Sequence, residues 1–340
     1  MSLGEKIRSY LIHRLGGVDR VPPTEEEIAT AFADFAGGNV DEWHFPMMND
    51  DGRNRAYETA LTAALKKGGT VLEIGTGSGL LAMIAARSGA SKVITCEAIS
   101  VIARKAVEII KQNGLSDRIQ VINKKSTDLV VGKDLSERAD LLVAEIFDNG
   151  LIGEQAFSSY AHAQKELLKP NAQLIPSGAR VVAMGLESRE IFEMHRVSKA
   201  AGFDVSAFNE FARKKYKSYH LDRYDYRPLT GNITLFDFDF RQAQSDAAVP
   251  VEFKAQHAGI CHAVAYWFEL RLDEKTTIDT GPGPSTPRSE RVATQAAPGV
   301  SPHSSWEQAV YCFETSVPLK VGDTLKLTAH HDSDRIWFSH

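Results

Sequence analysis

Val71–Gly79, which reads VLEIGTGSG, decides the fold of this chain. Its apolar first half is typical of a short buried strand, and the GxGxG run that follows opens an Ala-rich helix. Glycines at such a turn let a ligand come close to the backbone at a helix N-terminus. The spacing differs from the GxGxxG of the dinucleotide fingerprint, so the motif predicts a ligand site without choosing the ligand.

Strands and helices alternate around this motif. The runs of strand character are Thr70–Ile74, Lys92–Glu97, Ile119–Asn123 and Asp140–Ala144. The helical runs are Gly79–Ser88, Ser100–Asn113 and Glu154–Leu168. We expect Ser100 to cap its helix and Pro170 to end the last one. Such alternation predicts an α/β fold with a parallel sheet covered by helices on both faces.

The residue pattern changes after Pro176, where strand-like runs replace the alternation of strands and helices. The runs GARVVAMGLES, GNITLFDFDF, AVAYWFELRL, EQAVYCFETSV and DTLKLTAHHD are rich in Val, Tyr, Phe and Thr. They predict a mainly antiparallel β-barrel or sandwich. A charged, helix-like arm interrupts these runs at about residues 189–227, and a loop rich in Gly, Pro, Ser and Thr covers 280–305. We therefore expect an N-terminal helical segment at 1–58, an α/β domain at 59–175 and a β domain at 176–340.

Composition and charge argue against several classes of function, including nucleic-acid binding and membrane insertion. The 340 residues carry a formal net charge of −5, which gives no sign of a nucleic-acid surface. No apolar run approaches the ~18 residues of a membrane span. The N-terminus lacks the apolar stretch and cleavage site of a signal peptide. Cys96, Cys261 and Cys312 lie far apart and form no CxxC pair, so we expect reduced thiols, no zinc site and a cytoplasmic protein.

Polar residues end the next two strands. Glu97 stands at the end of the second strand, where a carboxylate can accept hydrogen bonds from both ribose hydroxyls of a ligand. NAD enzymes also place an acidic residue at this position, so Glu97 alone does not show which cofactor binds. Ser126 and Thr127 follow the third strand and are placed to contact an adenine, although a plain polar loop explains them equally well.

Two glutamates flank the loop after the fourth strand. Glu145 and Glu154 bracket the sequence EIFDNGLIGE, and ligands of open α/β sheets bind at the carboxyl ends of strands. A guanidinium is planar, charged and has five donors, so carboxylates on two sides could hold it in a fork. They would orient and polarise one nitrogen for attack. Without this location, two loop glutamates are more often solvated surface.

A third cluster, Trp43–Arg53, precedes the sheet. His44 and Arg53 could lie over a ligand, with Arg53 pairing a ligand carboxylate and Met47 lining an apolar wall. By spacing alone, the cluster is also a capped helix start with ordinary core residues.

Together these residues resemble the protein arginine methyltransferase family. The resemblance covers nearly the whole chain from about residue 40, and it includes His44, Met47, Asp50 and Arg53 at the spacing of the family's pre-sheet motif. The specific signal is the double-glutamate loop, because glycine motifs are shared by all class I methyltransferases. The DNGLIGE loop and the HHD-containing terminus are most similar to the monomethylating (type III) branch.

The resemblance implies a class I Rossmann-like sheet followed by a β-barrel, with a head-to-tail homodimer through the arm. It implies S-adenosylmethionine as cofactor, S-adenosylhomocysteine as product, no metal, and arginine in a protein or peptide as substrate. The implied cofactor site is His44, Met47, Arg53, Glu73, Gly75, Thr76, Gly77, Gly79, Leu80, Glu97, Ala98, Ser126 and Thr127. Glu145 and Glu154 would be catalytic, and Asp50, Ser305 and Trp306 would line the substrate channel.

Three departures from the family pattern bear on the product. The family's paired tyrosines are not evident, and only Phe32 and Phe35 stand in that stretch. Ser305 replaces a histidine, as in the symmetric-dimethylating branch, so the number of methyl groups transferred stays open. The stretch before Ser305 is longer and richer in proline than a tight substrate loop needs. Trp306 could wall the arginine channel or belong to the core.

Three alternatives compete with protein arginine methylation. The same chemistry on a small guanidino compound would require a closed pocket in place of an open groove. A catalytically silent scaffold that binds S-adenosylmethionine would fit the departures but not the intact Glu145 and Glu154. An NAD-dependent oxidoreductase would need a GxGxxG turn. The His330–Asp332 run looks like a metal cluster, but adjacent strand residues point to opposite faces, which favours a structural role.

Overall fold

The computed structural model describes residues 40–212, 214–283 and 304–339. Its first half is a five-stranded, entirely parallel sheet with the strand order β3-β2-β1-β4-β5. The strands are β1 (Thr70–Ile74), β2 (Lys92–Cys96), β3 (Ile119–Ile122), β4 (Ala139–Ala144) and β5 (Leu168–Ile175). The predicted α/β class is confirmed, and four of the strands lie within a residue of their expected ends.

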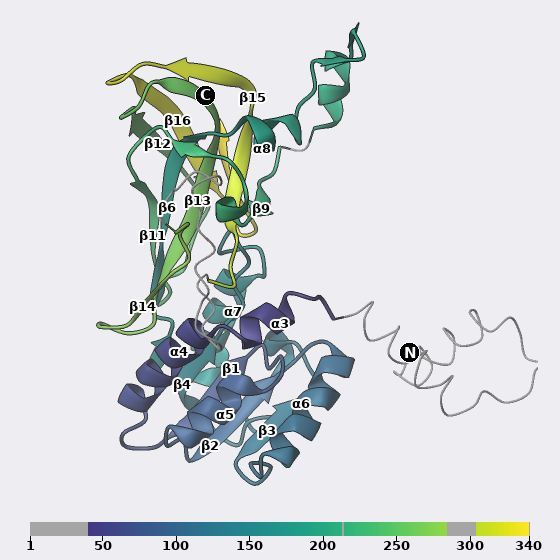
Figure 1. Cartoon of the computed structure of the whole chain (residues 1–340). Coiled ribbons are helices and arrows are strands. Elements are labelled where there is room, and N and C mark those ends of the chain that lie inside the picture. The colour runs from purple at the N-terminus through teal and green to yellow at the C-terminus, as the bar shows by residue number, and fades with distance from the viewer. Residues whose placement is uncertain (1–39, 213, 284–303, 340) are drawn as a thin grey trace, which may run out of the picture.

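Helices cover both faces of this sheet (Figure 1). They are α3 (His44–Met48), α4 (Asp51–Ala64), α5 (Leu80–Arg87), α6 (Ser100–Gln112) and α7 (Ala156–His162), with the short 3-10 turn η1 (Ser126–Asp128) and the π-helical segment η2 (Ala163–Leu167), which continues α7. The helix α6 buries one face and exposes the other, because Val101, Ala106 and Ile110 recur at helical spacing.

The prediction that Ser100 caps α6 is wrong. The capping position is Ile99, which contributes no side-chain bond, and Ser100 is the first helical residue. The Ser100 hydroxyl instead donates to Asn123 Oδ1 at 2.7 Å. It therefore ties the start of α6 to the loop after β3.

The expected helix Glu154–Leu168 begins two residues later than predicted, at Ala156. It continues from α7 through the π-helical segment η2 to Leu167, and β5, which contains Pro170, follows directly. The strand β5 pairs only with β4, so it lies at the edge of the sheet. An edge strand tolerates proline because one side of its backbone needs no partner.

The second half is antiparallel, as expected for a barrel or sandwich. One sheet has the path β10-β6-β13-β15-β9, with β11 paired to β6 and β14 to β13, and the other has the order β12-β16-β17. The strands are β6 (Gly178–Glu187), β9 (Lys217–Tyr219), β10 (Arg227–Pro228), β11 (Ile233–Asp239), β12 (Ala247–Lys254), β13 (Gly259–Arg271), β14 (Thr277–Asp279), β15 (Gln308–Leu319), β16 (Thr324–His331) and β17 (Ile336–Ser339).

The arm differs from its prediction in structure and extent. It contains α8 (Arg189–Glu193), the two-residue strands β7 (Lys199–Ala200) and β8 (Phe203–Asp204), and the turn η3 (Ser206–Phe211). After it, β9, the turn η4 (Leu221–Arg223) and β10 rejoin the barrel. The helix-like character expected across 189–227 is therefore confined to short pieces, and β9 and β10 within that range pair with the barrel strands β15 and β6. The part of the arm before β9 projects from the barrel in Figure 1.

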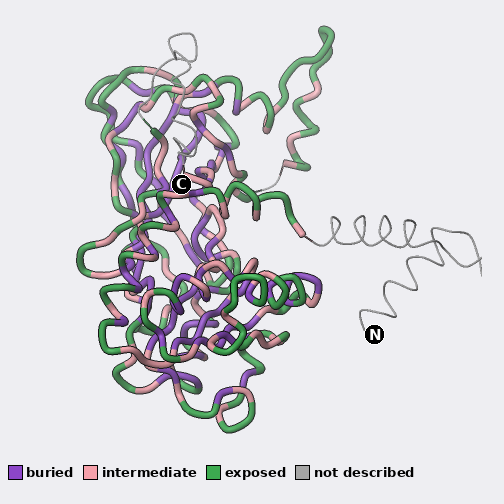
Figure 2. Tube along the Cα trace, turned by 60° about the horizontal axis from the view of Figure 1, so that its bottom comes forward, coloured by how far each residue is buried: buried purple, intermediate pink, exposed green. Residues whose placement is uncertain are grey.

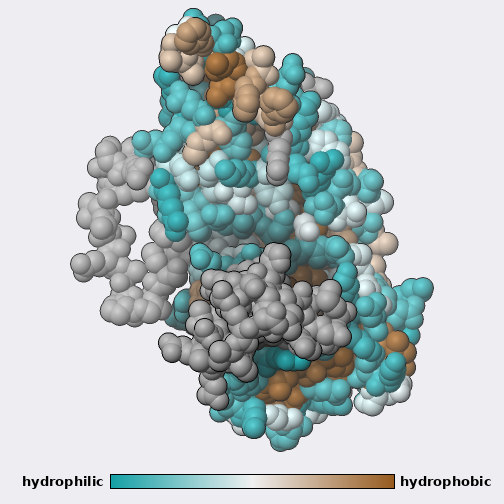
Figure 3. Space-filling view, turned by 90° about the vertical axis from the view of Figure 1, so that its right-hand side faces the viewer, coloured by the Kyte–Doolittle hydropathy of each residue, from teal (hydrophilic) through white to brown (hydrophobic). Residues whose placement is uncertain are grey.

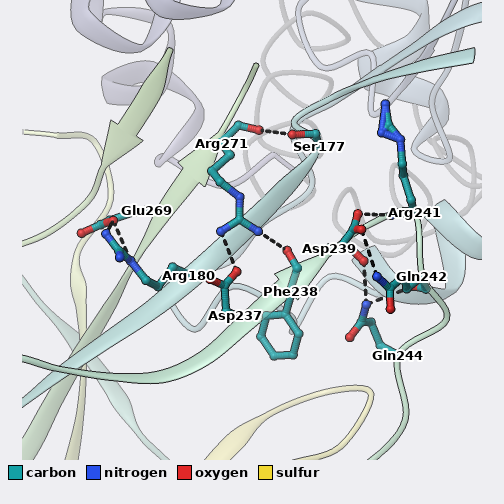
Figure 4. A network of polar contacts seen from close by, with 10 residues as sticks. All are labelled: Ser177, Arg180, Asp237, Phe238, Asp239, Arg241, Gln242, Gln244, Glu269 and Arg271. Atoms are coloured by element: carbon teal, nitrogen blue, oxygen red, sulfur yellow. Dashed lines mark hydrogen bonds and ion pairs between the residues drawn. The ribbon is translucent and has the colours of Figure 1, made fainter. Parts of the chain in front are cut away.

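Polar contacts brace the barrel where it meets the parallel sheet (Figure 4). The guanidinium of Arg271 donates to Asp237 Oδ1 at 2.6 Å and to the Phe238 carbonyl at 2.7 Å. The Ser177 hydroxyl donates to the Arg271 carbonyl at 3.1 Å, and Arg180 pairs with Glu269. These bonds link β6, β11 and β13 at the end nearest the parallel sheet.

One hydrophobic core runs through both halves. It joins parallel-strand residues such as Leu72 and Leu142 to barrel residues such as Phe253 and Phe268. Buried segments fill the interior of both halves in Figure 2, while the arm is mainly exposed. Within the described residues, no helix is both long and apolar enough to cross a membrane.

Candidate active site

A pocket of about 350 Å³ opens at the carboxyl ends of β1, β2 and β4. This is the edge where ligands of parallel α/β sheets bind. The structure brings together here, as lining residues, His44, Met47, Arg53, Glu73, Gly75, Thr76, Gly77, Leu80, Glu97, Ala98, Ser126, Thr127, Glu145 and Glu154. Residues from five separate stretches of the chain therefore meet in one cavity.

Sequence reasoning did not single out the rest of the lining. These residues are Asp41, Trp43, Met48, Ile74, Ser78, Leu81, Cys96, Ile99, Ile102, Lys124, Lys125, Ile146, Gln155 and Ser159. Some had a usable signal: Ile99 and Ile102 begin the helix after Glu97, so they share its strand end. Ser159 had none, because it reaches the pocket from the interior of α7.

The three glycines of the turn after β1 have different structural roles. Gly75 has φ 85°, and a Cβ there would lie 2.9 Å from Ile146 Cγ2, so this position requires glycine. Gly77 has φ 51° and open space beside it on the pocket side. Gly79 does not line the pocket; it caps α5, and a Cβ there would meet Ile110 at 3.1 Å. Gly79 therefore serves helix packing.

Glu97 is fixed by the backbone around it. One carboxylate oxygen accepts from the Gly77 amide at 3.1 Å and the other from the Ile99 amide at 2.9 Å. The remaining lone pairs face the pocket that Glu97 lines. The geometry suits a carboxylate that holds neighbouring hydroxyls of a ligand.

Arg53 and Glu145 form a buried ion pair in the floor of the pocket. Arg53 Nη2 donates to Glu145 Oε2 at 2.5 Å, and their side chains are 3 % and 7 % exposed. Arg53 Nη1 donates to Asn54 Oδ1 at 2.9 Å, whereas its buried Nε has no partner. Glu145 is thus already oriented before any acceptor arrives.

Glu73 lies close by, with both carboxylate oxygens buried beside the Thr95 side chain and the Ala82 backbone. Burial raises the pKa of Glu73 to about 8. Arg53 Nε has no partner, and the Glu73 carboxyl group, neutral at pH 7, would ionise when a cation binds beside it. Together the two groups suit the carboxylate and ammonium of an amino acid. The donor set therefore fits the methionine end of S-adenosylmethionine.

Glu154 lies at the far end of the loop that begins at Glu145. Partial burial raises the pKa of Glu154 to about 7, and the charges of Glu145 and Asp148 add to the effect. The side chain still has an open path to solvent. A carboxylate with these properties can bind a cation and take a proton near neutral pH.

The three expected channel residues lie beside the pocket and do not line it. Asp50 caps α4 by accepting from the Arg53 amide at 2.9 Å, and it also accepts from the Ser305 amide at 2.8 Å. Trp306 is buried, and its Nε1 donates to the Phe147 carbonyl at 3.1 Å. All three join the barrel to the parallel-sheet domain. Phe32 and Phe35 lie outside the described residues.

The described residues contain no group of three or more ligands that could hold a metal ion. The two histidines of the HHD run face opposite ways, as expected of adjacent strand residues. His330 stacks on Trp337, while His331 is buried against Phe236 and Phe238.

Two family descriptions match the chain. "Arginine methyltransferase oligomerization subdomain" matches residues 177–340, and "Ribosomal protein L11 methyltransferase (PrmA)" matches residues 58–201. An arginine N(omega)-methyltransferase from Streptomyces achromogenes subsp. streptozoticus is 40% identical over 309 residues, covering 90% of this chain and 81% of the relative. The chain belongs to the protein arginine methyltransferase family.

Other members of the family are more distant. Protein arginine N-methyltransferase 7 from Drosophila simulans and from Drosophila melanogaster are each 32% identical over 321 residues. These matches cover 86% of this chain but only 46% of each relative, so the chain spans about half their length.

Solved structures of two methyltransferases share the fold. The Trypanosoma brucei PRMT1 enzyme–prozyme complex with AdoHcy superposes with a TM-score of 0.71 at 21% identity, covering 86% of this chain and 88% of that one. Arabidopsis thaliana protein arginine methyltransferase 10 gives 0.64 at 19%, covering 86% and 96%. The chain is an S-adenosylmethionine-dependent arginine methyltransferase with the family's fold.

Proposed function

We propose that this enzyme transfers a methyl group to an ω-nitrogen of arginine in a protein or peptide. The observation that carries the proposal is the placement of Glu145 and Glu154 on the wall of the pocket that also contains the glycine turn. The names of the Drosophila relatives support a polypeptide acceptor.

The protein's own groups would hold the cofactor along its length. The Arg53 guanidinium would pair with its carboxylate, Glu73 with its ammonium and Glu97 with its ribose, while Ser126 and Thr127 would contact the adenine. The cofactor supplies an activated methyl group. The residues supply position, which accounts for much of the rate in reactions of this kind.

Glu145 and Glu154 would then hold the acceptor. The arginine guanidinium has a reference pKa above ~12, so it enters the pocket charged and is attracted to both carboxylates. Glu145 is held by Arg53 and acts as the fixed side of the fork. Glu154, with its pKa near 7, takes the proton that leaves the guanidinium during or after transfer.

Free arginine is a second candidate acceptor. The relative with 40% identity is named for arginine, without mention of protein, and the match covers most of both chains. The same two carboxylates would bind the guanidinium of the free amino acid.

An acceptor assay separates these candidates. The enzyme is incubated with S-adenosylmethionine and either an arginine–glycine-rich peptide or free arginine, and mass spectrometry locates the added methyl group. The proposal expects methyl on peptide arginine with kcat/KM at least about tenfold above that for free arginine. The reverse ratio would establish the second candidate, and fragmentation would give the number of methyl groups.

We also propose a homodimer that assembles through the arm. Phe203, Phe208 and Phe211 are 73 %, 67 % and 76 % exposed on the arm, and apolar atoms gather at that end of the face in Figure 3. A second apolar area lies lower on the same face. Two apolar patches at opposite ends of one face suit a head-to-tail pair of chains.

A further inference from the structure

The loop that carries the two glutamates has an unusual backbone. Leu151 has φ 79° and Gln155, directly after Glu154, has φ 61°. Among the described residues only one other non-glycine residue, Ala201 on the arm, has a positive φ. Left-handed backbone at residues with a Cβ persists only where the surroundings enforce it. The contacts around the loop must therefore hold it in shape.

Asp148 is the centre of those contacts. Its Oδ1 accepts from the Gly150 amide at 3.2 Å and from the Gly153 amide at 3.0 Å. Its carbonyl accepts from the Leu151 amide at 2.9 Å. The packing is close, since a Cβ on Gly153 would lie 2.2 Å from Asp148 Oδ2. One carboxylate thus folds the loop back on itself between the two catalytic glutamates.

Tyr216 holds this carboxylate from the barrel. The residue stands directly before β9, and its hydroxyl donates to Asp148 Oδ2 in a short hydrogen bond. Its ring lies against the loop backbone, since a Cβ on Gly150 would lie 2.8 Å from the ring. On its other side, the ring packs edge-on against buried Tyr266 at 5.6 Å. The tyrosine is therefore itself fixed by the barrel core.

The neighbours of Asp148 are also tied to the barrel. The Phe147 carbonyl accepts from Trp306 Nε1 at 3.1 Å, and Asn149 Oδ1 accepts from the Glu307 amide at 3.0 Å. Three consecutive loop residues thus each bond to a residue just before β9 or β15, which are paired strands. Of these three bonds, only the one from Tyr216 binds the Asp148 carboxylate, which also accepts the loop amides of Gly150 and Gly153.

We propose that Tyr216 is a positioning residue for methyl transfer, which through Asp148 lets the barrel set the spacing between Glu145 and Glu154. The inference rests on the role proposed above for those two glutamates. A displacement of about 1 Å in a reacting group can cost on the order of a hundredfold in rate. A single hydroxyl outside the pocket would therefore act on kcat without touching the cofactor or the acceptor.

The test is Tyr216→Phe, which keeps the ring against Gly150 and removes only the bond to Asp148. Tyr266→Phe is the matched control, since it removes a buried barrel hydroxyl that donates to the Ile336 carbonyl at 3.3 Å and does not touch the loop. For each protein, kcat and KM are measured with peptide and with free arginine. Calorimetry gives the affinity for S-adenosylhomocysteine, and hydrogen exchange gives the protection of residues 145–155.

We expect Tyr216→Phe to lower kcat at least about tenfold, with cofactor affinity within twofold of wild type and faster exchange across the loop. Tyr266→Phe should keep kcat within about twofold of wild type. In an Asp148→Ala background, Tyr216→Phe should cost less than about twofold more, because the carboxylate that the Tyr216 hydroxyl binds is already gone. Equal kcat in the two tyrosine variants, or unchanged loop exchange in Tyr216→Phe, would overturn the inference. If the wild type used neither acceptor, the proposed function would fail by itself, and hydrogen exchange would still test whether Tyr216 holds the loop between the two glutamates.

Discussion

At the scale of single residues, the carboxylates of the pocket differ in their contacts and in their exposure to solvent. Glu145 is neutralised by Arg53 and held in place, Glu97 is fixed by two backbone amides, and Glu154 keeps an open path to solvent. Only Glu154 combines access with a pKa near 7. The differences come from what surrounds each carboxylate, since the side chains themselves are identical.

The pH dependence of the reaction follows from Glu154. Its pKa is raised to about 7, so the ionised form that attracts the guanidinium and accepts the proton is lost as the pH falls below 7. We expect kcat/KM for the acceptor, at saturating cofactor, to fall about tenfold per pH unit below 7 and to level off above it.

Saturating cofactor matters in that experiment because Glu73 has a pKa of about 8 and lies at the cofactor end of the pocket. The residual activity of Glu154→Gln serves as the control and should be flat from pH 6 to pH 8, roughly. An unchanged acid limb in this variant would assign the limb to a different group.

Sequence reasoning proposed many of the residues that line the pocket, but none of the contacts that hold the double-glutamate loop. Glu97 and Glu145 directly follow strands of the parallel sheet, and Glu154 was paired with Glu145 because the two flank one loop. The contact between Asp148 and Tyr216 joins residues from two halves of the chain, so no local sequence pattern predicts it. The bond from the Ser305 amide to Asp50 also joins two distant parts of the chain, so no local pattern could predict that contact.

At the scale of helices and strands, periodicity predicted the central strands and the edge strand β3, but it missed two edge strands that contain a proline. The central strands β1 and β4 are buried and apolar, so their runs stand out. The strands β5 and β12 each contain a proline, at Pro170 and Pro250, and each lies at the edge of its sheet. Proline in a sequence argues against a strand unless the edge position is already known.

The arm is a second region where the local sequence pattern did not predict the structure. Its charged composition suggested helix, yet the chain there folds into a short helix, a two-stranded ribbon and a turn. Phe203 and Phe211 are largely exposed, and the ring of Phe211 packs edge-on against Phe208 of the same arm. Local propensity is a weak guide where contacts with another surface decide the structure.

At the scale of the whole molecule, the arm predicts the oligomeric state. Phe203→Asp places a charge in the proposed interface, whereas Val321→Asp does so at a similarly exposed position on a barrel turn. Light scattering should give the wild type and Val321→Asp twice the 37.4 kDa chain mass. Phe203→Asp should dissociate at concentrations at least about tenfold higher, because a charge is buried without a partner. A monomeric wild type, or two equally dimeric variants, would contradict the proposed interface.

The two halves of the molecule meet at the double-glutamate loop. The parallel sheet contributes most of the pocket lining, and the barrel holds the loop between Glu145 and Glu154 through Tyr216, Trp306 and Glu307. The central claim is therefore that an arginine guanidinium bound between Glu145 and Glu154 receives the methyl group.

The most direct measurement of that claim is the mass-spectrometric rate of methyl transfer to arginine by Glu154→Gln, beside wild type and the exposed control Glu252→Gln. Glutamine keeps the shape of the side chain and removes its charge. We predict a loss of about 10²- to 10³-fold in kcat/KM for Glu154→Gln, with unchanged affinity for S-adenosylhomocysteine, and wild-type activity for Glu252→Gln. Methyl transfer by Glu154→Gln at the wild-type rate would contradict the claim.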